Sequence, residues 1–150
     1  MMGWMSDISV QEADFDVGAE IAALSAGDDG ACAVASFVGL VRGGDILDMT
    51  LEHYPGMTEQ ALQEIIGQAC ECWQCRSVRV IHRVGRLLPG ERIVFVGVSS
   101  AHRHDAFAAC EFIMDYLKTR APFWKKETTA GGGRWVDARE SDDHAADRWK

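Results

Sequence analysis

Basic side chains gather in one segment of an acidic chain. The 150 residues carry 15 Lys and Arg against 23 Asp and Glu, a formal net charge of −8. Between Tyr116 and Trp135, five basic residues stand against a single acid, Glu127. The five are Lys118, Arg120, Lys125, Lys126 and Arg134. Lysine and arginine bind phosphate and carboxylate groups through charge-assisted hydrogen bonds. This segment is therefore a candidate site for an anionic substrate, with a solvated basic edge as the alternative.

Lys118 is expected in the last turn of a helix that ends before Pro122. A lysine in that position also complements the helix dipole, so it needs no function to explain it. Pro122 redirects the chain, and Lys125 and Lys126 consequently leave the helix axis. The aromatic pair that follows the proline is expected to pack and to hold these lysines near the helix end.

A second candidate is the stretch SSAHRHD, where a strand passes into a helix. A helix N-terminus favours anions, and His102 and Arg103 lie there with side chains that donate hydrogen bonds. The alternative is a pair of ordinary exposed residues in a turn. His102 and His104 have metal-ligand spacing, but no third ligand is evident.

A third candidate is the glycine-rich stretch FVGLVRGGD. Its glycines allow a tight turn and a close approach of the backbone to a ligand. It matches neither the Walker motif nor the dinucleotide fingerprint, and a plain hairpin turn with Arg42 at its mouth is the alternative.

The cysteines favour no metal site. Five are scattered along a chain without a secretion signal, which is typical of reduced cytosolic thiols. CECWQC lacks the second cysteine pair that would complete a zinc site, so we expect no metal there.

The elements that position these residues follow from apolar periodicity. Strands are predicted over residues 8–15, 31–42, 46–54, 77–85 and 91–100. Helices are predicted over residues 16–27, over 55–73 with Thr58 as N-cap, and from about Asp105. The order predicts an α+β fold: an antiparallel or mixed sheet with helices packed on one side, in a single domain over residues 1–150. Residues 31–42 and 46–54 are expected to form a hairpin, AGGGR a flexible loop within an irregular basic tail, and the polar C-terminal end a segment mobile until ordered.

Composition excludes several classes. No apolar run is long enough to span a membrane, and the N-terminal residues lack the pattern of a signal peptide. The acidic balance argues against nucleic acid as a partner. A cytoplasmic protein is expected.

Together these stretches resemble a known family. FVGLVR, MTLEHYPGMTE, VIHRVG, PGERIVFVGVSSAHR, FIMDYLKTRAPFWKKE and RWVDARESD closely resemble the catalytic subunit of molybdopterin synthase, in the right order from Phe37 to Trp149. The resemblance implies an α/β hammerhead-type subunit that forms a homodimer. Each end of the dimer binds a small ubiquitin-like sulfur-carrier subunit, which gives a heterotetramer. The carrier's C-terminal Gly-Gly, as a thiocarboxylate, donates sulfur twice to cyclic pyranopterin monophosphate, forming the dithiolene of molybdopterin. No cofactor and no metal are implied.

The resemblance also implies roles for residues. Lys118 and Lys125 match the catalytic lysines: Lys118 is expected to meet the carrier's C-terminal carbonyl, and Lys125 to act on the pterin or an intermediate. The matched substrate-pocket positions are Leu40 and Val41, through their backbone, and Arg42, His102, Arg103, Lys126, Glu127 and Arg139. Glu127 is expected to orient a lysine, whereas His102, Arg103 and Arg139 are expected to serve the neighbouring protomer's site. The sequence departs from the family at Leu40, where a lysine is common, and in a short loop after Arg42.

Two other classes of protein remain open at this point. The first is a non-catalytic docking scaffold for a ubiquitin-like carrier, against which the lysines at both matched positions argue. The second is an RNA-binding domain that stacks bases on Phe123 and Trp124 beside lysines, against which the net charge of −8 argues.

Overall fold

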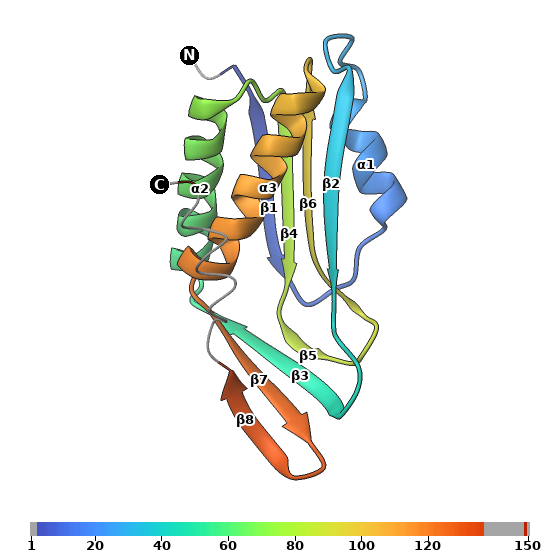
Figure 1. The fold of residues 1–150 in the computed structure, drawn as a ribbon, viewed down its shortest axis with the longest axis vertical. Coiled ribbons are helices and arrows are strands. Elements are labelled where there is room, and N and C mark those ends of the chain that lie inside the picture. The colour runs from blue at the N-terminus through green and yellow to red at the C-terminus, as the bar shows by residue number, and fades with distance from the viewer. Residues whose placement is uncertain (1–2, 137–148, 150) are drawn as a thin grey trace.

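The structure is a computed structural model that describes residues 3–136 and Trp149 (Figure 1). Its helices are α1 (Val17–Ser25), α2 (Met57–Cys72) and α3 (Arg103–Arg120). Its first four strands are β1 (Met5–Gln11), β2 (Ala33–Leu40), β3 (Ile46–His53) and β4 (Ser77–Arg83). The remaining strands are β5 (Gly85–Leu87), β6 (Arg92–Ser100), β7 (Phe123–Thr129) and β8 (Gly132–Val136). The α+β class predicted from the sequence is confirmed.

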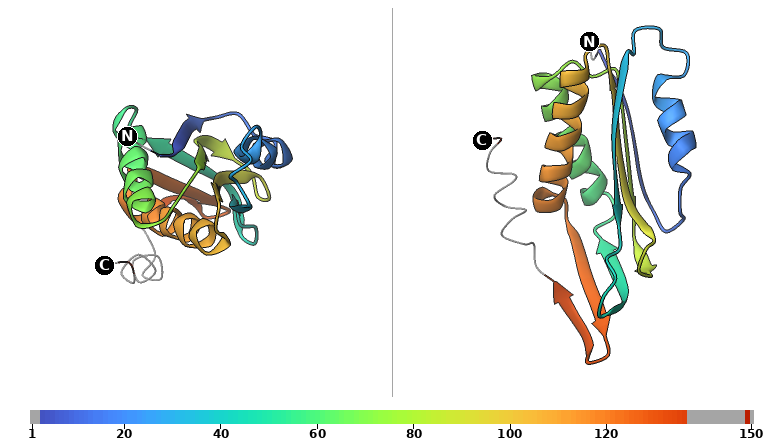
Figure 2. Two further views of the ribbon diagram at one scale, coloured as in Figure 1. Left: turned by 90° about the horizontal axis from the view of Figure 1, so that it is seen from above. Right: turned by 45° about the vertical axis from the view of Figure 1, so that its right-hand side comes forward.

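The larger sheet has the strand order β1-β4-β6-β2. Strand β1 runs parallel to β4, whereas β4 and β2 run antiparallel to β6, so the sheet is mixed. Because the central strand β6 is apolar on both faces, both faces of the sheet require cover. Helices α2 and α3 cover one face, and α1 covers the other (Figure 2).

The prediction of helices on one side is therefore wrong for α1. Leu24 of α1 packs with Phe15, Ile81 and Phe95 to form a small core on that face. A Cβ at Gly97 would lie 2.5 Å from Leu24 Cδ1, so the glycine leaves the room that this leucine fills.

The smaller sheet has the strand order β5-β3-β7-β8 and lies beyond one end of the larger sheet (Figure 1). The predicted hairpin of residues 31–42 and 46–54 is wrong, because β2 pairs with β6 and β3 pairs with β5 and β7. The segment after Pro122, predicted to be irregular, forms the β7–β8 hairpin. Its positive φ of 113° falls on Gly132, at the turn that AGGGR supplies.

The starts of α2 and α3 also differ from the prediction. Gly56, at φ 86°, is the N-cap of α2, and Glu59 Oε1 accepts a 3.3 Å hydrogen bond from its backbone N–H. Thr58, predicted as the N-cap, is instead fully buried in the first turn. Helix α3 begins at Arg103 after an N-cap at His102, two residues before the predicted start.

Trp149 packs on the main core between the two long helices. Its ring makes edge contacts with Trp73 and Phe112, with centroids 5.4 and 5.6 Å away. Its indole N–H donates a 2.6 Å hydrogen bond to Asp115 Oδ2. The predicted mobile segment before it lies outside the described residues. In the described part of the chain, no helix is both long and apolar enough to cross a membrane.

Candidate functional site

A cavity of about 370 Å³ opens where the larger sheet meets the smaller one. Strands β2, β3, β4, β6, β7 and β8 and the end of α3 contribute to its walls. Most of the lining residues are apolar, and three side chains of the described lining are polar: His82, Lys118 and Lys125. We call this space the lysine cavity. It brings together the two lysines that the sequence singled out.

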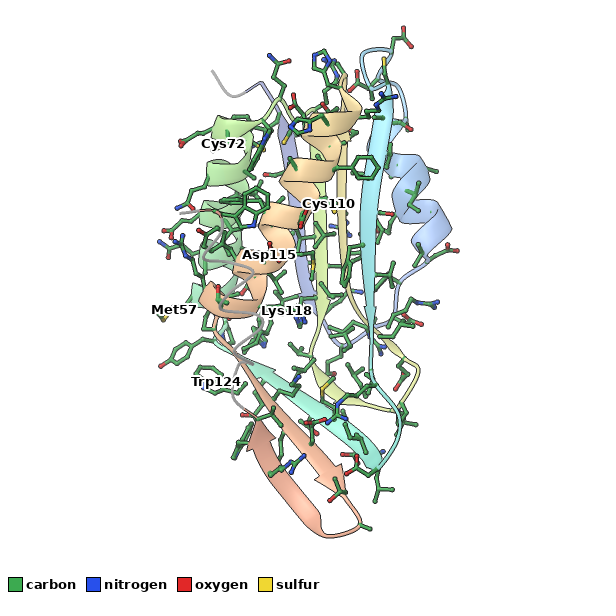
Figure 3. The ribbon with its side chains drawn as sticks, in the orientation of Figure 1. Met57, Cys72, Cys110, Asp115, Lys118 and Trp124 are labelled. Atoms are coloured by element: carbon green, nitrogen blue, oxygen red, sulfur yellow. The ribbon has the colours of Figure 1, made fainter. Side chains whose placement is uncertain are left out.

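Lys118 reaches the cavity because of its place on α3. The buried stripe of this helix includes Ile113 and Leu117, and Lys118 follows in the last turn with its side chain exposed. Figure 3 shows Lys118 at the end of α3 that is nearest the smaller sheet.

Lys125 reaches the same cavity from β7. Side chains alternate along a strand, so Phe123, Lys125 and Glu127 share one face of β7. Lys125 lies opposite Leu51 of β3 and Val136 of β8, and all three line the cavity. The strand alternation thus decides which lysine of the Lys-Lys pair enters the site.

Lys126 lies on the opposite face of β7, away from the cavity. Its Nζ is 5.9 Å from the centre of the Trp135 ring, on the neighbouring strand. Trp124 shares this outer face and is 46% exposed, and its ring lies near that of Tyr54. Within one protomer, Lys126 therefore lies on the face of β7 opposite to the cavity that Lys118 and Lys125 line.

Arg42 and Glu127 form an ion pair beside the cavity. Arg42 Nη2 lies 3.2 Å from Glu127 Oε2. The glutamate side chain is 3% exposed and the arginine side chain 49% exposed. This pair ties the segment after β2 to β7, two residues beyond Lys125. The predicted function of Glu127 in orienting a lysine stays a prediction.

Leu40 lines the cavity, whereas Val41 is not part of the described lining. Both backbone groups of Val41 bind the turn before β6: its N–H donates to the carbonyl of Glu91, and its carbonyl accepts from the N–H of Gly90, each at 2.9 Å. The chain thus presents the Leu40 side chain to the cavity and holds Val41 in the structure behind it.

His102 and Arg103 lie at the far end of α3. The helix has 18 residues, so a rise of about 1.5 Å per residue separates Arg103 from Lys118 by roughly 22 Å along its axis. A single protomer does not bring these residues into the lysine cavity. Arg139 lies outside the described residues.

His82 is a cavity residue for which the sequence predicted no function. Its ring stacks on Phe123, with centroids 3.8 Å apart, and its Nδ1 lies 2.8 Å from the carbonyl oxygen of Arg83. Burial, with smaller contributions from the charges of Lys118 and His53, lowers the pKa of His82 to about 4, although the backbone hydrogen bond with Arg83 acts in the opposite direction. The sequence feature that could have indicated His82 is a histidine among the mainly apolar residues of the predicted strand segment VIHRVG.

Metal ligands do not cluster in the described residues, where no group of three His, Cys, Asp or Glu side chains could hold an ion. Cys72 of the CECWQC segment is exposed and Cys75 is buried.

The fold and the cavity define an α+β protein in which two lysines from separate elements meet in one cavity. The model of the MoaE protein family matches residues 10–120. A molybdopterin synthase catalytic subunit from Ralstonia nicotianae is 60% identical over 149 residues, covering 97% of this chain and 85% of the relative. The chain therefore belongs to the MoaE family.

Solved structures agree with this assignment. The molybdopterin biosynthesis MoaE protein from Burkholderia ambifaria superposes with a TM-score of 0.85 at 56% identity, covering 97% of this chain and 98% of that chain. A complex of subunits 1 and 2 of the molybdopterin-converting factor from Helicobacter pylori matches with a TM-score of 0.73 at 19% identity, covering 89% and 90% of the two chains, and shows the fold alone. The expected enzyme function, that of a molybdopterin synthase catalytic subunit, is confirmed, and the scaffold alternative is not supported.

Proposed function

We propose that the lysine cavity is the active site in which sulfur passes from a carrier's C-terminal thiocarboxylate to cyclic pyranopterin monophosphate, twice per molecule. The observation that carries this proposal is the convergence of Lys118 and Lys125 on one cavity from α3 and β7. Its volume of about 370 Å³ is in the range of small-molecule sites.

Charge is the first part of the argument. The substrate carries a phosphate, the sulfur donor is an anionic thiocarboxylate, and the chain as a whole carries −8. The two lysines supply positive charge in a cavity that is partly shielded from water, where electrostatic interactions are stronger than in bulk water. In this proposal they hold both anions in contact and so assist a reaction between groups that otherwise repel each other.

Each lysine then has its own function. Once the carrier's sulfur is bonded to the pterin, water adds to the C-terminal carbonyl, and Lys118 stabilises the negative charge that develops on its oxygen. The C–S bond to the carrier then breaks, so that sulfur stays on the pterin and the carrier ends in a carboxylate. Lys125, which enters the same cavity from β7, stabilises charge on the pterin or transfers a proton to it. The Arg42–Glu127 ion pair holds β7, and with it Lys125, against the segment after β2.

The partners follow from the site and the family. A small ubiquitin-like carrier with a C-terminal Gly-Gly supplies the thiocarboxylate, and residues without side chains suit a narrow cavity. His102 and Arg103 lie roughly 22 Å along α3 from Lys118. In our proposal they serve the cavity of a second copy, within a homodimer that binds two carriers. Lys126 and Arg139 remain predicted substrate contacts.

Reconstitution tests the proposal. The purified chain, a thiocarboxylated carrier and cyclic pyranopterin monophosphate are mixed, and molybdopterin is quantified over time. We expect product only when all three are present, with none from a carrier that ends in a plain carboxylate. A chain that binds the carrier and yields no product would show that the cavity is not a sulfur-transfer site.

A further inference from the structure

The polar side chains of the lysine cavity differ in what they offer a ligand. Lys118 and Lys125 have donors only, because an ammonium group has no acceptor. Among the described lining residues, His82 alone carries a side-chain nitrogen that accepts hydrogen bonds strongly. A ligand with only anionic groups would need the lysines and nothing more.

The surroundings of His82 select one form of its ring. The carbonyl oxygen of Arg83, 2.8 Å from Nδ1, accepts and never donates, so Nδ1 carries the proton. The ring is buried and lies near Lys118, both of which favour the neutral state. A neutral ring with its proton on Nδ1 has a free lone pair on Nε2.

The ring is also fixed in position. It stacks on Phe123 at an angle of 17°, while the backbone contact holds Nδ1. Within the described residues, no hydrogen bond joins Nε2 to another group. An acceptor that is held in place on a cavity wall and left unpaired by the protein is arranged for a ligand donor.

We propose that Nε2 of His82 accepts a hydrogen bond from an N–H group of the bound pterin ring and so selects for this part of the substrate. This inference rests on the proposed function, which supplies a ligand with ring N–H groups. The lysines bind the anionic groups, and His82 recognises the neutral heterocycle. An analogue without the donor would leave Nε2 unpaired in a buried site and bind more weakly.

Nitrogen NMR of the unaltered protein tests the proposal directly. Histidine labelled with ¹⁵N reports the protonation of each ring nitrogen. We expect a free protein with protonated Nδ1 and bare Nε2, and an Nε2 resonance that moves toward the protonated position when cyclic pyranopterin monophosphate saturates the site. A proton on Nε2 in the free protein, or an unmoved Nε2 resonance at saturation, would overturn the proposal.

Variants separate recognition from structure. His82→Phe keeps an aromatic ring to stack on Phe123 and removes the acceptor, whereas His82→Gln restores an acceptor. For His82→Phe we expect KM for the pterin to rise roughly 3- to 10-fold, the range of one hydrogen bond, with kcat and carrier affinity within about twofold. His82→Gln should recover part of this loss, and His104→Gln, on the exposed start of α3, should match the wild type.

The outcomes are distinguishable. A folded His82→Phe variant with unchanged KM overturns the contact. If that variant does not fold, the NMR titration of the wild type decides. A wild-type protein that makes product while Nε2 stays unmoved refutes this inference and leaves the proposed function standing. A wild-type protein that neither binds nor converts the pterin refutes both.

Discussion

The hydroxyl of Thr58 donates a hydrogen bond to the carbonyl oxygen of Pro122 at 3.0 Å, and the same hydroxyl accepts one from the N–H of Tyr54. Thr58 is in the first turn of α2, and Pro122 lies between Lys118 and Lys125. This fully buried side chain therefore fixes the turn that sets the two lysines relative to each other.

Replacing Thr58 should destabilise the protein. Thr58→Val keeps the shape and removes two part-buried hydrogen bonds, so we expect a loss of about 1–3 kcal/mol in the free energy of unfolding, measured with urea. Thr58→Ser should recover most of it. Thr119→Val, which removes only local hydrogen bonds within α3, is the control. A Thr58→Val variant as stable as the control would contradict this account.

Replacing Lys118 should abolish catalysis and leave the fold intact. The structural loss for Lys118→Ala is at most about 1 kcal/mol, because a lysine in the last helical turn contributes mainly through the dipole. Loss of transition-state stabilisation should lower the rate of molybdopterin formation at least about 100-fold. Arg120→Ala removes the same charge from the same turn outside the described cavity lining and should retain activity. Turnover near wild type would remove Lys118 from the mechanism.

Removing Arg42 alone should destabilise the protein more than removing both charges of the Arg42–Glu127 pair. Arg42→Ala leaves a buried carboxylate without this cation, so we expect it to lower the free energy of unfolding by about 1–3 kcal/mol. The double variant Arg42→Ala with Glu127→Gln should be more stable than Arg42→Ala alone, because the buried charge is gone. A double-mutant cycle measures this coupling. Losses that simply add would show that the two side chains do not interact.

His82 should make stability depend on pH. Its pKa is about 4 in the folded protein and about 6.5 in the unfolded chain. Between these values the unfolded chain binds more protons, so acidification favours unfolding: the stabilisation is complete above pH 6.5 and is lost as pH falls toward 4. From pH 7 to 4.5 we expect His82 to contribute a loss of roughly 2 kcal/mol. Urea unfolding at both pH values should show a smaller loss for His82→Phe; equal losses would mean that burial does not depress this pKa.

The carrier's tail should matter more for reaction than for association. A tail of two glycines is short, so most of the buried area must come from the carrier's globular surface. Deleting both glycines should eliminate sulfur transfer and weaken binding only in part. Titration calorimetry and the turnover assay separate the two effects, and sulfur transfer by a truncated carrier would contradict the proposed entry of the tail into the cavity.

Local sequence was sufficient for part of this structure. The spacing of apolar residues on α3 and the position of Pro122 placed Lys118 at a helix end. Residues 92–100, which form β6, are apolar on both faces, a pattern typical of a central strand with a helix packed on each face of its sheet. The fold class and the lysines therefore followed from short-range patterns.

Pairing between distant segments was the part that local sequence could not provide. Strand β7 is rich in lysine and threonine and precedes a run of glycines, which is typical of a loop, and only its pairing with β3 makes it a strand. That pairing also decides that Lys125 faces the cavity and Lys126 faces away. His82 was missed because its local sequence indicates no function. Its contacts with Arg83 and Phe123 and its closeness to Lys118 arise only in the folded structure.

The pairing of β3 with β7 has a consequence for synthesis of the protein. Leu51 is translated roughly 70 residues before its partner Lys125. At a translation rate of about 5–20 residues per second, β3 is synthesised on the order of several seconds before β7, the strand that pairs with one of its edges. Until then an apolar strand that carries Met49 and Leu51 has an open edge, which is a site for pairing with other chains. The geometry that places Lys125 in the cavity thus leaves one edge of β3 unpaired until late in synthesis.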